Sequence, residues 1–309
     1  MSGSDVSVSV VIPTWRGAEH ISLLLQSLWR QTLCPAEVIV IDSSSTDDTA
    51  SIAAEAGCTV EVIPKAAFDH GATRNLAARM ARGEILVFMT QDAAPAGADF
   101  LERLVQPIQQ GKASAAYARQ LPHPDTPPPE AFARGFNYPA GSHLKSLADL
   151  PRLRIKTFFF SNVASAIDRE VFEQLGGFPE HVIMNEDMHF AAKLLMSGRK
   201  IAYQAEAKVF HSHDYRLGQQ FKRNFDIGVS MAQARGWPRG ASAGGEGVRF
   251  ALGQLGFLLS RGHWRWVPRT LVELGLKHTA FQLGRQERWL PLGLKRVLSL
   301  HRQYWDTPR

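Results

Sequence analysis

Polar side chains follow three apolar segments that have the composition of β-strands. The segments are residues 6–12, 37–41 and 84–89, and the polar residues after them are Pro13-Thr14, Asp42 and Thr90-Gln91-Asp92. In a mostly parallel sheet, the carboxyl ends of the strands meet at one edge, and ligands of α/β proteins bind there. The spacing therefore predicts a polar site at that edge, with the carboxylates of Asp42 and Asp92 as its charged groups.

Two of these positions also have an interpretation that needs no ligand. Asp42 can accept the imide N–H of uracil or thymine, but it can equally open the Ser-rich turn that follows it. Pro13 and Thr14 can form the wall of the same base pocket, or they can simply end the strand. The residues alone leave these alternatives open.

Charged residues also lie at the starts of two predicted helices. Arg74 falls in the first turn of a helix predicted over 72–82, where backbone N–H groups and a guanidinium make a site for an anion such as a diphosphate. The alternative for Arg74 is an ion pair with a nearby carboxylate. Glu186 and Asp187 open a helix predicted over 186–197, where the helix dipole favours ionised carboxylates. From spacing alone, capping of the helix is sufficient to explain Glu186 and Asp187.

The elements that must position these residues alternate between strand and helix. Helical spacing of apolar residues and helix-end signals predict helices over 19–30, between Thr46 and Gly57, over 72–82 and over 99–110. Further strands are predicted at 59–63 and 113–118. This alternation is typical of βαβ units on a mostly parallel sheet that helices cover on both faces. The composition of residues 119–150 predicts a long loop. The pattern then continues with a predicted strand at 156–167, a helix at 169–175 and a strand at 200–204.

The order of motifs resembles a known enzyme family. The motifs are VSVVIPTWRG, VIVIDSSSTDDT, DHGATRN, GEILVFMTQDAAP, NEDMHFAAKLLMSG and VFHSH, spread over about residues 6–215. Together they resemble inverting family-2 glycosyltransferases, which have a GT-A fold and use nucleotide-diphosphate sugars. The pieces TRN, TQDA and HSHDY are most similar to the bacterial rhamnosyltransferases. The resemblance implies transfer of a sugar, with dTDP-L-rhamnose as the expected donor and a UDP-sugar as the alternative, to a cell-surface polysaccharide or a lipid-linked glycan.

The resemblance also implies roles for the polar residues. Asp42 corresponds to a nucleotide contact, and Arg74 to part of the donor-site motif. Asp187 corresponds to the general base that takes the proton of the acceptor hydroxyl, with Glu186 as a partner that orients it or binds the acceptor. Ser161-Asn162 and Gly177-Phe178 resemble acceptor-side elements, although turn and packing roles fit them equally well.

A divalent metal, Mg²⁺ or Mn²⁺, is expected from the same resemblance. Gln91-Asp92 stands at the place of the family's DXD motif, so only Asp92 keeps a carboxylate for a hard cation. We interpret Gln91 as a mark of the rhamnosyltransferase subtype. A histidine often ligates the metal in GT-A enzymes, and His211 is the favoured candidate here, with His213 second. Arg223 lies beyond and can contact the acceptor or a phosphate.

The C-terminal part of the chain differs in charge from the rest. Residues 231–309 hold 13 Lys and Arg against 4 Asp and Glu, and they account for the net charge of +6. The sequence predicts a GT-A domain over 1–230 and a basic, Trp-rich helical extension over 231–309. Basic and aromatic residues interleaved in this way fit an anionic membrane surface. A helical packing or oligomerisation appendage is the alternative, and nucleic acid is not expected because no recognition motif accompanies the charge.

The composition excludes several other classes of protein. The two cysteines form no CxxC motif, which excludes a disulfide scaffold and a zinc ribbon. No signal peptide or membrane span is predicted, so we expect a cytoplasmic protein, peripheral on the cytoplasmic face of the membrane. A sugar nucleotidyltransferase would need a Gly-rich basic loop after the first strand, which PTWRGAEH does not supply. A non-catalytic, membrane-associated binding module with a degenerate site remains the alternative, because of Gln91.

Overall fold

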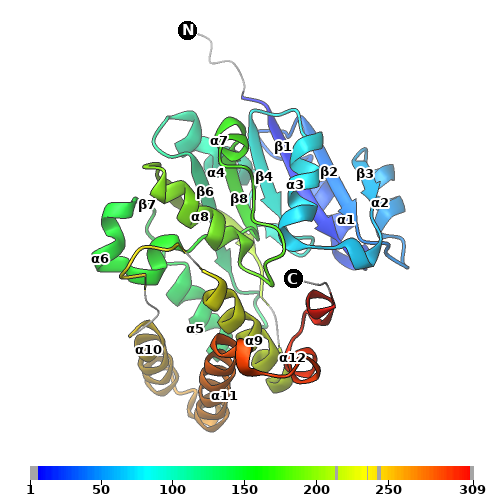
Figure 1. The fold of residues 1–309 in the computed structure, drawn as a ribbon. Helices are drawn as coiled ribbons and strands as arrows, with labels where there is room; N and C mark the ends of the chain where they lie inside the picture. Colours follow the sequence, from blue (N-terminus) through cyan, green and yellow to red (C-terminus); the bar gives the residue numbers. More distant parts are fainter. Residues whose placement is uncertain (1–5, 213–214, 235, 242–244, 307–309) are drawn as a thin grey trace.

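A computed structural model describes residues 6–212, 215–234, 236–241 and 245–306, and Figure 1 shows its fold. One sheet carries the strands β1 Val8–Thr14, β2 Glu37–Asp42, β3 Thr59–Val62, β4 Ile85–Met89, β5 Ala94–Pro95, β6 Ala115–Leu121, β7 His143–Lys145, β8 Ala164–Asp168 and β9 Ile201–Phe210. The helices around it are α1 Ala18–Leu28, α2 Thr49–Glu55, α3 His70–Met80, α4 Phe100–Gln109, α5 Pro128–Asn137, α6 Leu150–Leu153, α7 Arg169–Gln174 and α8 Glu186–Met196. The helices that follow are α9 Leu217–Gln233, α10 Glu246–Ser260, α11 Val267–Arg285 and α12 Leu292–Leu298.

The sheet has a parallel half and a mixed half. Its strand order is β3-β2-β1-β4-β8-β6-β9-β5, with β7 also paired to β9. Strands β1 to β4 are parallel to one another, whereas β8 runs antiparallel between β4 and β6. The predicted α/β fold with a mostly parallel, helix-covered sheet is confirmed, and its parallel half brings the ends of β1, β2 and β4 to one edge.

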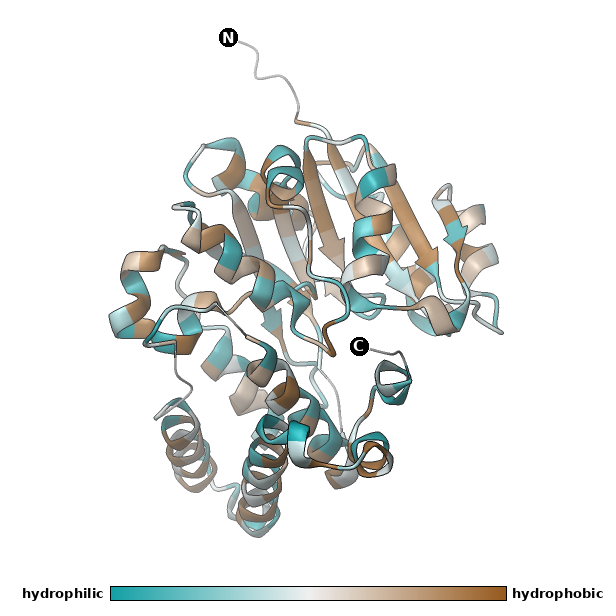
Figure 2. Cartoon of the chain, viewed as in Figure 1, coloured by the Kyte–Doolittle hydropathy of each residue, from teal (hydrophilic) through white to brown (hydrophobic). Residues whose placement is uncertain are grey.

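Each face of the sheet has its own core because alternate residues of a strand point to opposite faces. Val8, Val10 and Ile12 of β1 pack with α1 and α4, whereas Val11 packs on the other side with α3, α7 and α8. Figure 2 shows the central strands as the most hydrophobic part of the molecule. Such continuous apolar strands are expected where both faces are covered. This double cover fixes the strand ends on which the polar residues stand.

Three predicted elements differ from the structure. The loop predicted over 119–150 contains helix α5 and strand β7, because Pro128 begins a helix that the Pro-rich composition masked. The strand predicted over 156–167 is wrong in its first half, where residues 154–158 form a 3-10 helix, and only β8 at its end is extended. The last strand extends to Phe210, well beyond the predicted residue 204, and carries its end to the site.

The C-terminal helices lie beyond the carboxyl ends of the strands (Figure 1), where α11 and α12 contact α9, and α10 contacts α5 and α11. The backbones of α9 and α11 touch: a Cβ on Gly228 would lie 2.2 Å from the Phe281 carbonyl oxygen, and one on Gly284 would lie 2.0 Å from that of Phe225. Helix α9 crosses the predicted boundary at residue 230, so the division into two domains stays a prediction. Within the part of the chain described here, no helix is long and apolar enough to span a membrane.

Candidate active site

The ends of β1 and β2 form one side of the site. Thr14 and Asp42 are paired in the sheet register, and both are buried. Asp42 Oδ1 accepts hydrogen bonds from the hydroxyls of Thr14 at 3.0 Å and Ser45 at 2.6 Å, and its Oδ2 accepts from the Ser45 N–H at 2.7 Å. Asp42 therefore opens the Ser-rich turn after β2. Its predicted contact with a base, and the roles of Pro13 and Thr14 beside it, stay predictions.

Gln91 joins the loop after β4 to the loop after β1. Its Oε1 accepts the Trp15 N–H at 2.9 Å, and its Nε2 donates to the Trp15 carbonyl at 3.1 Å. A Cβ on Gly17 would lie 2.4 Å from Gln91 Oε1, so the glycine leaves the room that this amide occupies. An aspartate carboxylate at position 91 could not donate the second bond. The amide thus has a positioning role next to Asp92.

Asp92 faces His211 across a short gap. His211 Nε2 lies 3.6 Å from Asp92 Oδ2, and His211 Nδ1 lies 3.0 Å from Oε1 of Gln120. The amide nitrogen of Gln120 donates to the hydroxyls of Tyr138, at 2.5 Å, and Ser161, at 3.0 Å, so Oε1 is its acceptor. Nδ1 of His211 therefore donates to Gln120, and Nε2 faces the Asp92 carboxylate, the orientation in which a histidine can ligate a metal.

These two side chains fit a divalent metal as a partial ligand set. Carboxylate oxygen and neutral imidazole are both suitable ligands for Mn²⁺, and Mg²⁺ favours the oxygen. Among the residues that the structure describes, no group of three or more His, Cys, Asp or Glu could hold a metal. A metal here would therefore take further ligands from the phosphates of the donor and from water. His213, the second histidine predicted for this role, lies outside the described residues.

Arg74 is buried in an ion pair with Glu186. Its Nη1 lies 3.2 Å from Glu186 Oε1 and donates to the carbonyl oxygen of His70 at 2.9 Å. The structure thus shows the alternative interpretation of Arg74, and a contact with diphosphate stays a prediction. Glu186 also accepts from the side chain of Asn162 at 3.1 Å. Burial acts to raise the pKa of Glu186, but the Arg74 charge and the Asn162 amide outweigh it, and its pKa is lowered.

Asp187 lies beside this pair and is held by backbone donors. Its Oδ2 accepts the Asn162 N–H at 3.1 Å, and its Oδ1 accepts the Met188 N–H at 2.7 Å. Burial, followed by the negative charge of Glu186, raises the pKa of Asp187 to about 7. A carboxyl group with a pKa near neutrality is well suited to act as a general base. Asn162 therefore binds both carboxylates: its backbone N–H donates to Asp187, and its side-chain amide donates to Glu186.

The turn before α8 is held from the C-terminal side of the chain. Asn185 has φ of 62°, in the left-handed region, and its amide donates to the Ser230 hydroxyl of α9 at 3.2 Å. Ser230 in turn donates to the Met184 carbonyl at 2.8 Å. Strained backbone of this kind persists where the surroundings fix it, and it is frequent at functional sites. No spacing pattern in the sequence linked Ser230 to this turn.

The segment after α12 also reaches the site. The Leu300 N–H donates to Oδ2 of the buried Asp226 at 2.9 Å, which places the His301 ring 5.0 Å from that of His70. Burial, and then the charges of His70 and Arg223, lower the pKa of His301 to about 3, so the ring is neutral. His70 supplies the carbonyl that Arg74 binds. Sequence analysis missed this contact, because residues 70 and 301 lie in separate parts of the chain.

Asn75 and the Gly177-Phe178 turn have packing roles. Asn75 donates to the Phe178 carbonyl and accepts the Phe178 N–H, both at 2.9 Å. Gly177 has φ of 71°, and a Cβ there would lie 2.6 Å from Asn75 Oδ1. Phe178 is buried among the aromatic rings of α7 and α8. The structure thus favours the packing interpretation for this turn.

Comparison with known proteins places this site in context. The family model described as glycosyl transferase family 2 matches residues 9–176. The chain is 40% identical over 305 residues to the O-antigen chain rhamnosyltransferase RfbN of Salmonella typhimurium, covering 98% of this chain and 97% of the relative. It is 41% identical to the O-antigen chain rhamnosyltransferase WbaN of Salmonella anatum, covering 97% and 96%. Among solved structures, the chain is similar to the mannosyltransferase PcManGT from Pyrobaculum calidifontis in complex with GDP-Man and Mn²⁺. The two structures superpose with a TM-score of 0.64 at 20% sequence identity, over 93% of this chain and 89% of that one.

Proposed function

The chain belongs to glycosyl transferase family 2 and has the GT-A fold, and from this premise we propose that it is a rhamnosyltransferase. The proposed donor is dTDP-L-rhamnose, and the proposed acceptor is a hydroxyl group of a growing cell-surface polysaccharide or a lipid-linked glycan. The observation that carries the proposal is the 40% identity, over 98% of this chain, with an O-antigen chain rhamnosyltransferase. The arrangement of Asp92, His211 and Asp187 supports it.

In the proposed mechanism, Asp187 accepts the proton of the acceptor hydroxyl. The hydroxyl oxygen attacks the anomeric carbon of rhamnose as the bond to the nucleoside diphosphate breaks, and a single displacement of this kind inverts the anomeric centre. Asn162 and Met188 orient the carboxylate through their N–H groups. Glu186 stays ionised beside Arg74, and its charge keeps the pKa of Asp187 high enough to take a proton near neutrality.

Asp92 and His211 are the residues that would hold Mg²⁺ or Mn²⁺, with His213 as a further candidate outside the described residues. The metal would neutralise the negative charge that develops on the leaving diphosphate. Gln120 keeps the proton of His211 on Nδ1, and Gln91 fixes the loop that carries Asp92. Pro13, Thr14 and Asp42 would line the pocket for the base, and Gln91 would border the diphosphate.

A donor-consumption assay tests the proposal. Purified protein with Mn²⁺ or Mg²⁺ is incubated with dTDP-L-rhamnose, and with UDP- and GDP-sugars as alternatives, and release of the nucleoside diphosphate is measured with and without acceptor. We expect turnover with dTDP-L-rhamnose. We also expect that Asp187→Asn loses about 10²-fold or more of this rate, as removal of a general base does, and still binds dTDP. Wild-type protein that turns over no donor with any acceptor would instead favour a non-catalytic binding module.

The exposed aromatic residues of the C-terminal part support a peripheral membrane contact. Trp264 is 63% exposed and Trp289 is 73% exposed. The guanidinium groups of Arg265 and Arg288 lie 5.4 Å and 4.8 Å from the rings of Trp264 and Trp289. Indole rings beside cations suit the interface of an anionic bilayer, where the ring sits at the headgroup level. We therefore propose that this part of the chain binds the cytoplasmic face of the membrane.

Vesicle co-sedimentation tests the membrane contact. We expect wild-type protein to sediment with phosphatidylglycerol vesicles, and the Trp264→Ser/Trp289→Ser variant to stay largely in the supernatant. Leu23→Ser is the matched control, because Leu23 is 68% exposed on α1, in the other part of the chain. Equal sedimentation of the double Trp variant and the wild type would contradict the proposal.

A further inference from the structure

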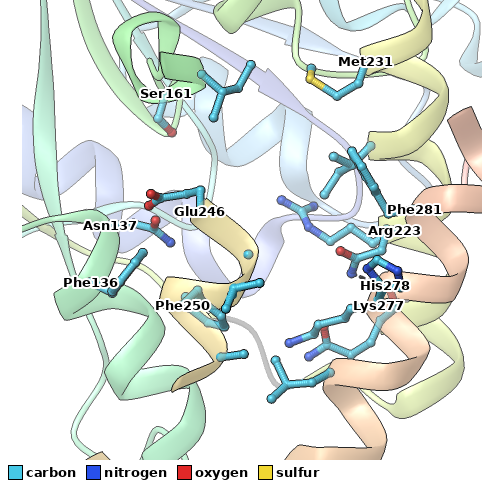
Figure 3. Close-up of a pocket in the computed structure, with 18 of the residues that line it drawn as sticks. Phe136, Asn137, Ser161, Arg223, Met231, Glu246, Phe250, Lys277, His278 and Phe281 are labelled. Atoms are coloured by element: carbon cyan, nitrogen blue, oxygen red, sulfur yellow. Dashed lines mark hydrogen bonds between the residues drawn. The ribbon is translucent and has the colours of Figure 1, made fainter. Parts of the chain in front are cut away.

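A large cavity lies between the catalytic residues and the C-terminal helices. Its volume is about 1270 Å³, and its walls come from α5, α9, α10 and α11. Figure 3 shows Phe136 and Asn137 of α5 on one side, and Arg223, Lys277 and His278 of α9 and α11 on the other. Pockets for drug-sized ligands measure about 300–1,000 Å³. The cavity therefore has room for more than a single sugar ring.

The inner end of the cavity reaches the catalytic centre. His211, which faces Asp92, and Ser161, which precedes the residue that binds Asp187, both line it. Tyr138 lies at the same end, and the charges of both Asp187 and Arg223 act on its pKa, which burial raises to about 12. The cavity thus connects the proposed base with the groups described next.

The middle of the cavity is cationic. Its described lining carries the basic residues Arg134, Arg223, Lys277, His278 and Arg285 and the acidic residues Glu130 and Glu246. Both acidic residues are already paired, Glu130 with Arg134 at 2.8 Å and Glu246 with Lys156 at 2.7 Å. Lys277 lies 3.9 Å from Glu273, a carboxylate outside the lining, whereas within the described part of the chain no carboxylate pairs with Arg223 or Arg285. The guanidinium of Arg223 instead lies 5.6 Å from the Tyr215 ring. This distribution leaves excess positive charge that an anionic ligand would neutralise.

Apolar side chains share the lining of the cavity with these cations. Phe250 of α10 and Phe281 of α11 line it together with Arg223, His278 and Lys277 (Figure 3), and Val248, also in the lining, is 63% exposed. Leu252 follows Val248 by one turn of α10 and is 67% exposed, and Leu271 precedes the lining residue Leu274 by one turn of α11 and is 53% exposed. Exposed apolar residues next to a cavity mark a binding surface for an apolar group. Cations and apolar side chains in one cavity match a molecule that has an anionic group joined to a hydrocarbon chain.

We propose that this cavity binds the carrier end of the acceptor: a glycan joined through a phosphate or diphosphate to a lipid chain. Arg223 and Lys277 contact the phosphate, the lipid chain leaves past Phe250 and Val248, and the sugar end lies toward Asp187. The inference rests on the proposed function, since it identifies how the acceptor of that reaction is held. The donor lies at the inner end, where His211 borders the cavity, and Asp92 itself does not line the cavity.

A binding experiment with a simple probe tests the inference on the full-length protein. The probe is farnesyl diphosphate, which has a diphosphate and a hydrocarbon chain but no sugar, measured by calorimetry with saturating dTDP and Mn²⁺ present. We expect the Arg223→Gln/Lys277→Gln variant to bind the probe about tenfold more weakly or worse, because hydrogen bonds to a charged group are lost. Arg261→Gln is the matched control: Arg261 is an exposed cation at the end of α10 that does not line the cavity.

Further measurements separate the sources of the signal. Farnesol and inorganic diphosphate should each bind more weakly than farnesyl diphosphate, because each lacks one half of the recognised molecule. The double variant should sediment with phosphatidylglycerol vesicles as wild type does, which distinguishes the carrier phosphate from a membrane headgroup. Where the double variant has a lowered melting temperature, Lys277→Gln alone gives the same readout.

Three results would overturn the inference: unchanged probe affinity in the variants, equal affinity for farnesol, or displacement of the probe by dTDP. The probe contains no rhamnose and is not turned over. A failure of the rhamnosyl donor assignment therefore leaves this measurement intact, and the two failures are distinguishable.

Discussion

The pH dependence of turnover tests the assignment of Asp187 through its neighbour. Burial first, and the charge of Glu186 second, raise the pKa of Asp187 to about 7. The base must be ionised to accept a proton, so kcat/KM of the wild type should fall as the pH falls through about 7. Glu186→Gln removes the neighbouring negative charge and keeps an oxygen that can accept from Arg74 and Asn162. The pKa of Asp187 should then drop, and the acid limb should move to lower pH.

The size of the shift follows from the distance between the two carboxylates. Glu186 and Asp187 each accept a hydrogen bond of 3.1 Å from Asn162, one from its side chain and one from its backbone. Taking a charge separation of ~7 Å and an effective dielectric constant of ~20, the repulsion is ~2.4 kcal/mol, or ~1.7 pH units. Asp187 is only partly buried, so solvent weakens the repulsion. We therefore expect the acid limb to move down by about one pH unit.

The assay is the steady-state rate of donor consumption across the neutral pH range, with the melting temperature measured at each pH. Arg74→Gln is the control of opposite sign, because the Arg74 charge acts to lower the pKa of Asp187 and its removal should move the acid limb to higher pH. Variants that melt like the wild type, yet keep the acid limb where it was, would refute the electrostatic argument. So would a shift in the same direction in both variants.

Three other perturbations have outcomes that the structure predicts. Asp92→Ala and His211→Ala should each abolish metal-dependent binding of dTDP in calorimetry, and unchanged affinity with Mn²⁺ present would count against both as ligands. Gly228→Ala should lower the free energy of unfolding by about 1–3 kcal/mol, because its Cβ would overlap the backbone of α11. Gly275→Ala on α11, where a Cβ meets nothing within 4 Å, should not. Asp187→Asn should melt at a higher temperature than the wild type above pH 7, because the raised pKa of Asp187 means that the fold loses stability as this group ionises. The difference in melting temperature should vanish below the ordinary pKa of an aspartate.

The parallel half of the fold was predictable because its strands are buried on both faces. Residues 37–41 and 84–89 are continuously apolar after a first glutamate, and they cover most of β2 and all of β4. The mixed half was less accessible to pattern analysis. Strand β8 pairs antiparallel between β4 and β6, a pairing between residues far apart in the chain that no local period encodes. Helix α5 was missed because prolines at its start resemble a loop, although proline is well tolerated in a first helical turn.

The site shows the same division between local and distant contacts. Glu186 and Asp187 were found because they open a helix inside a recognisable motif. Gln120, which fixes the tautomer of His211, and Ser230, which supports the turn before α8, were not. Their roles are hydrogen bonds to residues at least 40 positions away, and neither residue type marks chemistry by itself. Sequence patterns thus identify the groups that react more readily than the groups that orient them.

The ion pair of Arg74 decides how charge is distributed in the site. If Arg74 contacted the diphosphate instead, Glu186 would remain buried without its cation, and a carboxylate in that state is strongly disfavoured. A protonated Glu186 would no longer hold the pKa of Asp187 up, whereas an ionised Glu186 without its cation would push that pKa higher. In either case the loss of Arg74 from this pair would move the pKa of the base away from about 7. While Arg74 stays paired with Glu186, the negative charge of the leaving diphosphate can be met at Asp92 and His211, where the structure offers ligands for a cation.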